Sequence, residues 1–184
     1  MWAVVGLGNP GLRYAETRHN VGFMLVRRAA KDWEIRLRKP KFSAKTGEGR
    51  RAGERVVLAL PETYMNESGQ AVKALIVGME IPTEHLVVVF DDVDLALGEI
   101  RVRRDGGPGT HRGMTSIVGL IGPSFPRIRV GIGPVPEGTE ITDFVLEAFR
   151  PSEKKLLAGS LDRAMDALEL VLDGQIDQAM NRYN

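Results

Sequence analysis

The sequence predicts an α/β fold, in which one domain is built on a mixed, twisted β-sheet surrounded by helices. Segments with the pattern of strands alternate along the chain with segments of helical period. No linker rich in proline or serine and no internal repeat divides the 184 residues, which are enough for one domain and too few for two ordinary ones. We therefore expect residues 1–184 to form a single unit.

The first half of the chain begins with strand and helix patterns in turn. Residues 1–5 predict a short buried strand that runs into a glycine-rich turn at residues 6–11. Asn20 is placed to cap a helix, because the apolar residues after it recur at spacings of three and four. The other elements predicted here are strands or hairpin arms at 36–42, 46–51 and 55–60, a turn at Gly53 and Glu54, and a helix at 68–79.

The second half contains the strongest strand pattern, at residues 86–90. This run is apolar throughout, as expected of a central strand covered on both faces, and we expect it to stop at Asp91, Asp92 and Asp94. A later apolar stripe at helical spacing predicts a long helix. The elements predicted here are strands at 99–104 and 127–132, a loop at 105–113, a short helix at 114–121, and the long helix, opened by Ser152 and closed by Gly174.

The composition excludes several kinds of functional site and of targeting segment. The absence of cysteine excludes a disulfide scaffold, a thiolate zinc site and a cysteine nucleophile. The apolar run at residues 2–8 is too short to span a bilayer and no basic segment precedes it, so we expect no signal peptide, no membrane contact and a cytoplasmic location.

Charge is distributed unevenly along a chain whose formal net charge is only +1. Residues 27–55 hold 11 basic and 4 acidic side chains, whereas residues 137–184 hold 5 basic and 10 acidic ones. A cationic face recruits polyanions by releasing their counterions, but a solvated charged surface has the same composition. Both interpretations stay open at this point.

The glycine-rich turn Gly6-x-Gly8-x-x-Gly11 matches the pattern of a dinucleotide-binding loop. That loop needs a helix to start at the turn, and here Pro10 and a polar stretch at residues 12–20 come first. The alternative is a rigid turn, stiffened by proline, that presents the side-chain amide of Asn9.

Candidate chemistry centres on histidine and aspartate. His19 and His111 lie in loops, where sites are usually mounted, whereas His85 fits a surface position at a strand edge. Asp91 follows a buried strand, where an open α/β sheet places its crevice, and an aspartate there can fix the tautomer of a histidine. The three aspartates also fit loop capping or a magnesium site. Because the chain has no Gly-x-Ser-x-Gly elbow and no cysteine, we expect water to be the attacking group if an aspartate and a histidine are catalytic.

Six ordered motifs resemble those of the bacterial-type peptidyl-tRNA hydrolases. The resemblance implies a single α/β domain that acts as a monomer, without metal or other cofactor, to hydrolyse the ester between a peptide and the terminal ribose of tRNA. The matching segments are residues 6–11 with Tyr14, Arg18-His19-Asn20-Val21-Gly22, Tyr64-Met65-Asn66-x-Ser68-Gly69, residues 91–95, Gly106-Gly107-x-Gly109-x-His111-x-Gly113, and Arg127-x-Arg129-x-Gly131-Ile132-Gly133. Asp143-Phe144-Val145-Leu146 extends the resemblance toward the last helix.

Carried over position by position, the resemblance makes His19 the general base and Asp91 its partner. It makes Asn9 and Asn66 the amides that position water, the scissile carbonyl or the peptide backbone. It also implies a set of groups that bind the acceptor stem and 3′ end of tRNA: Tyr14 and Tyr64 in the groove for the 3′ end, Met65 beside the site, His111 on the opposite wall, and Arg103 and Arg129 on phosphates.

Three positions depart from the family pattern. Phe90 stands where many members have histidine, and Thr110 where glycine is usual. Arg112 follows His111 at a gating or substrate-contact position that is usually asparagine, and a guanidinium cannot accept a hydrogen bond as an amide oxygen can. Two alternatives to the hydrolase remain. One is a non-catalytic RNA-binding relative, like a plant organellar splicing factor of this fold, and the other is a metal-dependent phosphohydrolase built on Asp91, Asp92 and Asp94.

Overall fold

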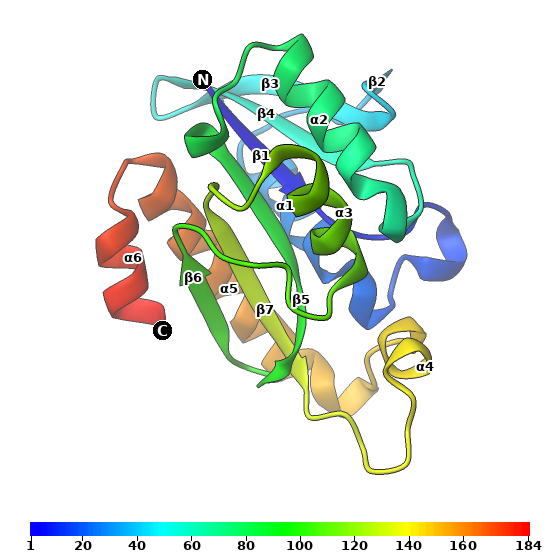
Figure 1. Cartoon of the computed structure of the whole chain (residues 1–184). Coiled ribbons are helices and arrows are strands. Elements are labelled where there is room, and N and C mark those ends of the chain that lie inside the picture. Colours follow the sequence, from blue (N-terminus) through cyan, green and yellow to red (C-terminus); the bar gives the residue numbers. More distant parts are fainter.

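The computed structural model describes residues 1–38 and 40–184, together with the backbone of residue 39 (Figure 1). A seven-stranded mixed sheet runs in the order β2-β3-β4-β1-β5-β7-β6. Neighbours are parallel from β4 through β1 and β5 to β7, and antiparallel at both edges. The strands are β1 (Trp2–Gly6), β2 (Lys39–Lys41), β3 (Ala44–Arg51), β4 (Glu54–Pro61), β5 (Leu86–Ala96), β6 (Ile100–Arg103) and β7 (Arg127–Gly133). The predicted single α/β domain on a mixed sheet is confirmed.

Helices cover both faces of this sheet (Figure 1). The helices α1 (Val21–Asp32) and α5 (Lys154–Leu172) pack on one face, and α2 (Ser68–Gly78) and α3 (Arg112–Ile121) pack on the other. Two further helices, α4 (Ile141–Leu146) and α6 (Ile176–Tyr183), each add buried side chains to the core cluster under α1 and α5. No helix in the described residues is both long and apolar enough to cross a membrane.

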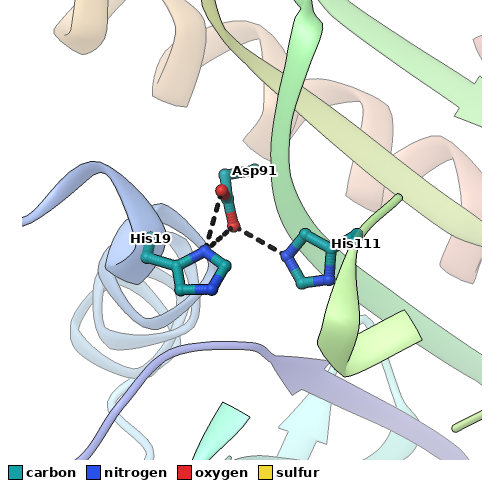
Figure 2. Close-up of side chains that lie close together, drawn as sticks. All are labelled: His19, Asp91 and His111. Atoms are coloured by element: carbon teal, nitrogen blue, oxygen red, sulfur yellow. Dashed lines mark hydrogen bonds and ion pairs between the residues drawn. The ribbon is translucent and has the colours of Figure 1, made fainter. Parts of the chain in front are cut away.

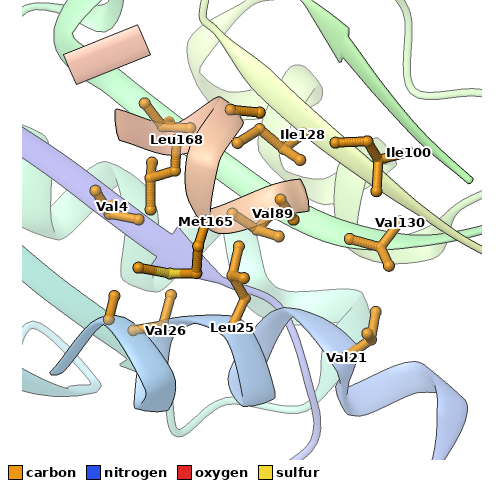
Figure 3. Close-up of a cluster of buried hydrophobic side chains, with 14 of the residues drawn as sticks. Val4, Val21, Leu25, Val26, Val89, Ile100, Ile128, Val130, Met165 and Leu168 are labelled. Atoms are coloured by element: carbon orange, nitrogen blue, oxygen red, sulfur yellow. The ribbon is translucent and has the colours of Figure 1, made fainter. Parts of the chain in front are cut away.

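Alternating side chains of the strands build the two halves of the core. Val4 and Val89 join the cluster under α1 and α5, where they meet Leu25 and Met165 (Figure 3). Their neighbours in the strands, Val5 among them, point to the opposite face and pack under α2 and α3. The central strands are therefore buried on both faces, which explains their continuous apolar sequence.

Several boundaries differ from those predicted. β5 does not stop at the aspartates but continues to Ala96, because Asp91 and Asp92 pair with Val130 and Gly131 of β7 and the register shifts only after Asp92. The tight turn between β3 and β4 is at Ala52 and Gly53, both at positive φ, rather than at residues 53 and 54. β2 is shorter than predicted, α3 begins two residues earlier, and α4 and α6 had no prediction.

The start of α1 lies directly against the sheet. A Cβ atom on Gly22 would come within 2.3 Å of the carbonyl oxygen of Val89 and 2.5 Å of the amide nitrogen of Leu7. A Cβ on Gly6 would meet the carbonyl oxygen of Gly22 at 2.2 Å. Only glycine fits at these two positions, and the close approach fixes the polar turn before α1 relative to β1 and β5.

We expect Gly22→Ala to destabilise the fold by about 1 to 3 kcal/mol, the usual range for an overpacked core contact, because the added methyl meets backbone that has no room to move. Denaturant unfolding measures this change. Gly119→Ala is the matched control: it lies within α3 with no atom near its Cβ position, so it should leave stability equal or raise it by up to about 1 kcal/mol. Equal stability of the Gly22 variant and the parent would contradict the close approach.

Candidate active site

The candidate residues meet where the parallel strands end. Asn9 lies in the turn after β1, Asn66 in the short turn after β4, and Asp91 within β5. They line an open cavity of about 630 Å³, which sits at the carboxyl edge of the sheet, where open α/β sheets bind ligands. Every site residue singled out in the sequence lines this cavity except Tyr14, whose ring lies 4.5 Å beneath the guanidinium of Arg13.

Asp91 accepts hydrogen bonds from two imidazoles (Figure 2). His19 Nδ1 lies 2.9 Å from both carboxylate oxygens, and His111 Nε2 lies 2.9 Å from Oδ1. The opposite nitrogen of His111, Nδ1, accepts the backbone N–H of Met114 at 3.2 Å, so His111 carries its proton on Nε2. His19 correspondingly donates from Nδ1, which leaves Nε2 as its basic nitrogen.

The Asp91 carboxyl is 2% exposed and stays ionised. Burial raises its pKa, but the electrostatic interactions with His111 and His19 and the hydrogen bonds from both rings outweigh burial. The pKa of Asp91 is therefore held well below its usual value. A buried carboxylate in this state accepts the Nδ1–H of His19 and holds that ring in one orientation.

A second buried network fixes Asn9. The Asn20 side chain accepts the Asn9 backbone N–H at 2.8 Å and donates to the Asn9 carbonyl at 2.9 Å. The side-chain oxygen of Asn9 accepts the backbone N–H of Met65 at 2.9 Å. Its Nδ2 group finds no acceptor among the described residues, and Asn9 lines the cavity. Asn20 takes the N-cap position of α1, as predicted, but its side chain makes no cap bond and binds the backbone of Asn9 instead.

The remaining candidates are arranged around the rim of the cavity. Tyr64 and Asn66 are exposed, while Met65 between them is buried. Arg112 is exposed at the first residue of α3. Phe90 lies beneath the site, with its ring 4.9 Å from that of His111 in an edge-on contact. The ring thus packs against one of the two imidazoles that bind Asp91.

Arginines gather on the face of β6 and β7 that borders the cavity. Residues 100, 102, 128 and 130 of these strands point into the core, so the alternate positions Arg101, Arg103, Arg127 and Arg129 share the opposite face. Burial and the neighbouring charges of Arg101 and Arg129 lower the pKa of Arg103. Arg129 pairs with Asp92. This face carries a concentrated positive charge with only part of it neutralised.

Arg127 has a structural position that the sequence did not reveal. It is buried, stacks 4.2 Å from the ring of Phe125, and donates to the carbonyl oxygens of Gly106 and Pro123, each at 2.6 Å. Burial, partly offset by Asp105, lowers the pKa of Arg127 to about 10. It anchors the glycine-rich loop that forms one wall of the cavity.

The aspartates do not gather as a carboxylate metal site would require. Asp92 binds Arg129 and accepts the backbone N–H of Asp94, while Asp94 is exposed. Among the described residues the grouping with ligand atoms close enough for a metal is His19, Asp91 and His111, and hydrogen bonds join these same atoms. The geometry disfavours a phosphohydrolase built on three aspartates.

Sequence reasoning missed three contributions to the site. Asn20 was assigned to a helix cap and Arg127 had no role, although both lie within motifs that the sequence singles out. The wall formed by α4, with Ile141, Val145 and Leu146 lining the cavity, was also missed. Two of these apolar side chains are well exposed, and this exposure, which would have been the signal, is visible only in three dimensions.

Comparisons with known proteins agree on one family. A family model for peptidyl-tRNA hydrolase matches residues 3–184. Peptidyl-tRNA hydrolase of Roseiflexus castenholzii is 50% identical over 100% of this chain and 87% of its own length, and that of Chloroflexus aurantiacus is 48% identical over 100% and 99%. The crystal structure of peptidyl-tRNA hydrolase from Acinetobacter baumannii is 40% identical, covers 100% of this chain and 96% of that one, and superposes with a TM-score of 0.94. The chain therefore belongs to the peptidyl-tRNA hydrolase family.

Proposed function

We propose that this protein hydrolyses the ester between a peptide and tRNA, releasing tRNA for reuse in translation, and that His19 is the general base. The observation that carries this proposal is the hydrogen bond from His19 Nδ1 to a buried, ionised Asp91, which leaves Nε2 basic at the cavity. The amides of Asn9 and Asn66 line the same cavity, and the relatives described above carry the name of this activity.

The reaction follows from these groups. His19 Nε2 takes a proton from water as the oxygen attacks the ester carbonyl, and Asp91 stabilises the imidazolium that forms. The amide of Asn9, or that of Asn66, donates to the carbonyl oxygen as negative charge develops on it. Collapse of the tetrahedral intermediate breaks the bond to the ribose oxygen, which receives the proton from His19. A base contributes roughly 10² to 10⁴ and an oxyanion donor roughly 10² to 10³ in rate.

The arginine-bearing face of β6 and β7 supports a place for the acceptor stem. Arg103 and Arg129 line the cavity beside the catalytic groups, so phosphates held there would leave the 3′ end near His19. Contacts to phosphates carry no base information, which suits an enzyme that accepts most tRNAs. We propose that the protein acts as a monomer in the cytoplasm, because one chain supplies every group of the mechanism and its substrate is found there.

The direct test uses a peptidyl-tRNA, and the same tRNA carrying a free aminoacyl group, both in EDTA. We expect hydrolysis of the peptidyl substrate to persist in the chelator and to exceed that of the free aminoacyl ester. His19→Ala should abolish turnover while leaving tRNA affinity nearly unchanged, because the imidazole moves a proton rather than holding nucleic acid. No release of tRNA by the parent would exclude the hydrolase, and variant activity within about threefold of the parent would remove His19 from its role.

Asp91→Asn tests the partner of the base. His111 donates to Oδ1, so the new amide keeps its oxygen at that position and places its NH₂ group at the Oδ2 position, 2.9 Å from His19 Nδ1. This favours the tautomer of His19 protonated on Nε2, which cannot accept a proton from water, and we expect kcat to fall at least about tenfold. The acid limb of the pH profile should move to lower pH, since a neutral amide no longer stabilises the protonated ring.

Asp92→Asn is the control for that change, because Asp92 belongs to the same strand but binds Arg129 instead of a histidine. Its kcat should stay within about threefold of that of the parent. An unchanged rate and pH profile in Asp91→Asn would make Asp91 structural.

Asn9→Asp tests discrimination between blocked and free amino groups. The side-chain oxygen that binds Met65 is retained, while the Nδ2 donor that faces the cavity becomes a charged acceptor. Losing one placed polar contact is worth about 1 to 3 kcal/mol, or roughly 5- to 150-fold. We expect hydrolysis of the peptidyl substrate to fall and its advantage over the free aminoacyl ester to narrow, measured as the ratio of the two kcat/KM values. A constant ratio with both rates reduced would assign Asn9 to water or to the carbonyl.

Arg103→Gln tests the phosphate contacts. It should weaken binding to all tRNAs alike and reduce the slope of log affinity against log salt by about one. Arg104→Gln removes the same charge one residue away, but Arg104 pairs with Asp177 and does not line the cavity, so its slope should change less. Equal changes in the two variants, or loss of binding to a single tRNA species, would contradict the assignment.

A further inference from the structure

Arg18, next to the general base in the chain, is buried and makes its side-chain contacts with one distant segment. This segment, residues 141–153, is called the strap below. It contains α4, which supplies part of the cavity wall, and the short turn after it. Only 1% of Arg18 is exposed, and its Nε atom has no hydrogen-bond partner among the described residues.

The guanidinium of Arg18 holds the strap at several points. One terminal nitrogen donates to the Ala148 carbonyl at 3.1 Å and lies 3.4 Å from Glu147. The other binds both carboxylate oxygens of Glu153, at 2.9 and 3.1 Å. The charged plane also lies 4.4 Å from the centre of the Phe144 ring and 5.5 Å from that of Phe149. Both terminal nitrogens and both ring contacts thus go to the same segment.

Backbone contacts join the strap to the same turn. The Arg18 N–H donates to the Glu147 carbonyl at 3.0 Å, the Phe149 N–H donates to the Glu16 carbonyl, and Thr17 forms an isolated bridge with Ala148. Without the side chain, these backbone bonds and the buried side chains of Phe144, Val145 and Phe149 would be left to hold the strap. A segment that loses its polar contacts while keeping only a few buried side chains opens locally at lower free energy than before.

We propose that Arg18 is a positioning residue that locks the strap against the turn carrying His19, and so sets the distance between the apolar wall of α4 and the general base. Ile141, Val145 and Leu146 then face the cavity at a fixed separation from His19. This inference rests on the proposed function, because it assigns the wall to the acyl part of the ester substrate. The hydrogen bond from His19 to Asp91 does not involve the strap, so the lock acts on binding and not on the proton transfer.

Two variants weaken the contact between Arg18 and the strap, one at Arg18 and one at Glu153. Arg18→Lys keeps the charge but loses the two-pronged contact and the flat stacking surface. Glu153→Gln keeps the shape on the strap side and removes the charge, at a residue exposed enough for the fold to tolerate the change. The matched control is Glu137→Gln, which removes one negative charge from the exposed loop before α4, outside the contacts of Arg18.

Steady-state kinetics on a peptidyl-tRNA and hydrogen exchange are measured on all four proteins. We expect both lock variants to raise KM about 5- to 20-fold with kcat within twofold, and to speed exchange of the amides of residues 141–150 at least tenfold while those of β1 and β5 stay protected. The control should match the parent in both measurements.

Three results would overturn the proposal. Unchanged exchange in the strap would show that Arg18 does not hold it. Faster exchange with unchanged KM would show that the wall does not meet the substrate, and a fall in kcat at constant KM would place the effect on His19. In each case the parent hydrolyses the substrate, which distinguishes these results from failure of the proposed function, where the parent itself is inactive.

Discussion

The buried carboxylate of Asp91 constrains the whole site. A charge with so little exposure needs donors around it, and the protein supplies two imidazole N–H groups from segments that lie 72 residues before it and 20 residues after it. Those donors must converge on one point, so the turn before α1 and the start of α3 are held in fixed positions over β5. The backbone of α3 adds a further restraint, since the N–H of Met114 orients His111.

The short 3₁₀ helix Arg18–Asn20 connects the general base to two other parts of the site. A 3₁₀ helix has three residues per turn, so three consecutive side chains leave it in three directions. His19 reaches Asp91, Asn20 reaches the backbone of Asn9, and Arg18 reaches the strap. The positions of His19, of Asn9 and of the strap therefore all depend on one rigid segment of backbone. The contact of Gly22 with the sheet holds this segment in place.

The sequence allowed accurate prediction wherever local pattern decides structure. The apolar runs located β1 and β5, alternation of polar and apolar residues is visible in β7, and helical spacing located α1, α2 and α5. Prediction failed where long-range pairing decides. Nothing near Asp91 indicates that β5 continues beyond it, because that extension depends on β7. The helix α4 is too short for a periodic pattern, and its position depends on Arg18, more than 120 residues earlier.

The site shows the same division. The motif resemblance brought the His19, Asp91 and Asn9 positions together before any geometry was known, since each lies in a segment with a recognisable pattern. Asn20 was correctly placed at the start of α1, but its side chain binds the backbone of Asn9 and not that of the helix. The sequence does not distinguish these two partners, because an asparagine side chain can bind either its own helix or a neighbouring loop. Tyr14 lies in a matching segment but outside the cavity, a distinction made by the path of the loop.

The arginine-bearing face of β6 and β7 lowers the stability of the folded protein. Register places Arg101 opposite Arg129 and Arg103 opposite Arg127, so like charges face each other across neighbouring strands. Such pairs oppose folding, and Asp92 relieves only one of them. A polyanion bound at the proposed phosphate contacts would remove the rest of this repulsion, so the proposed binding of tRNA would also stabilise the fold. Under this proposal, the arginines that would bind phosphates are the same residues whose mutual repulsion opposes folding.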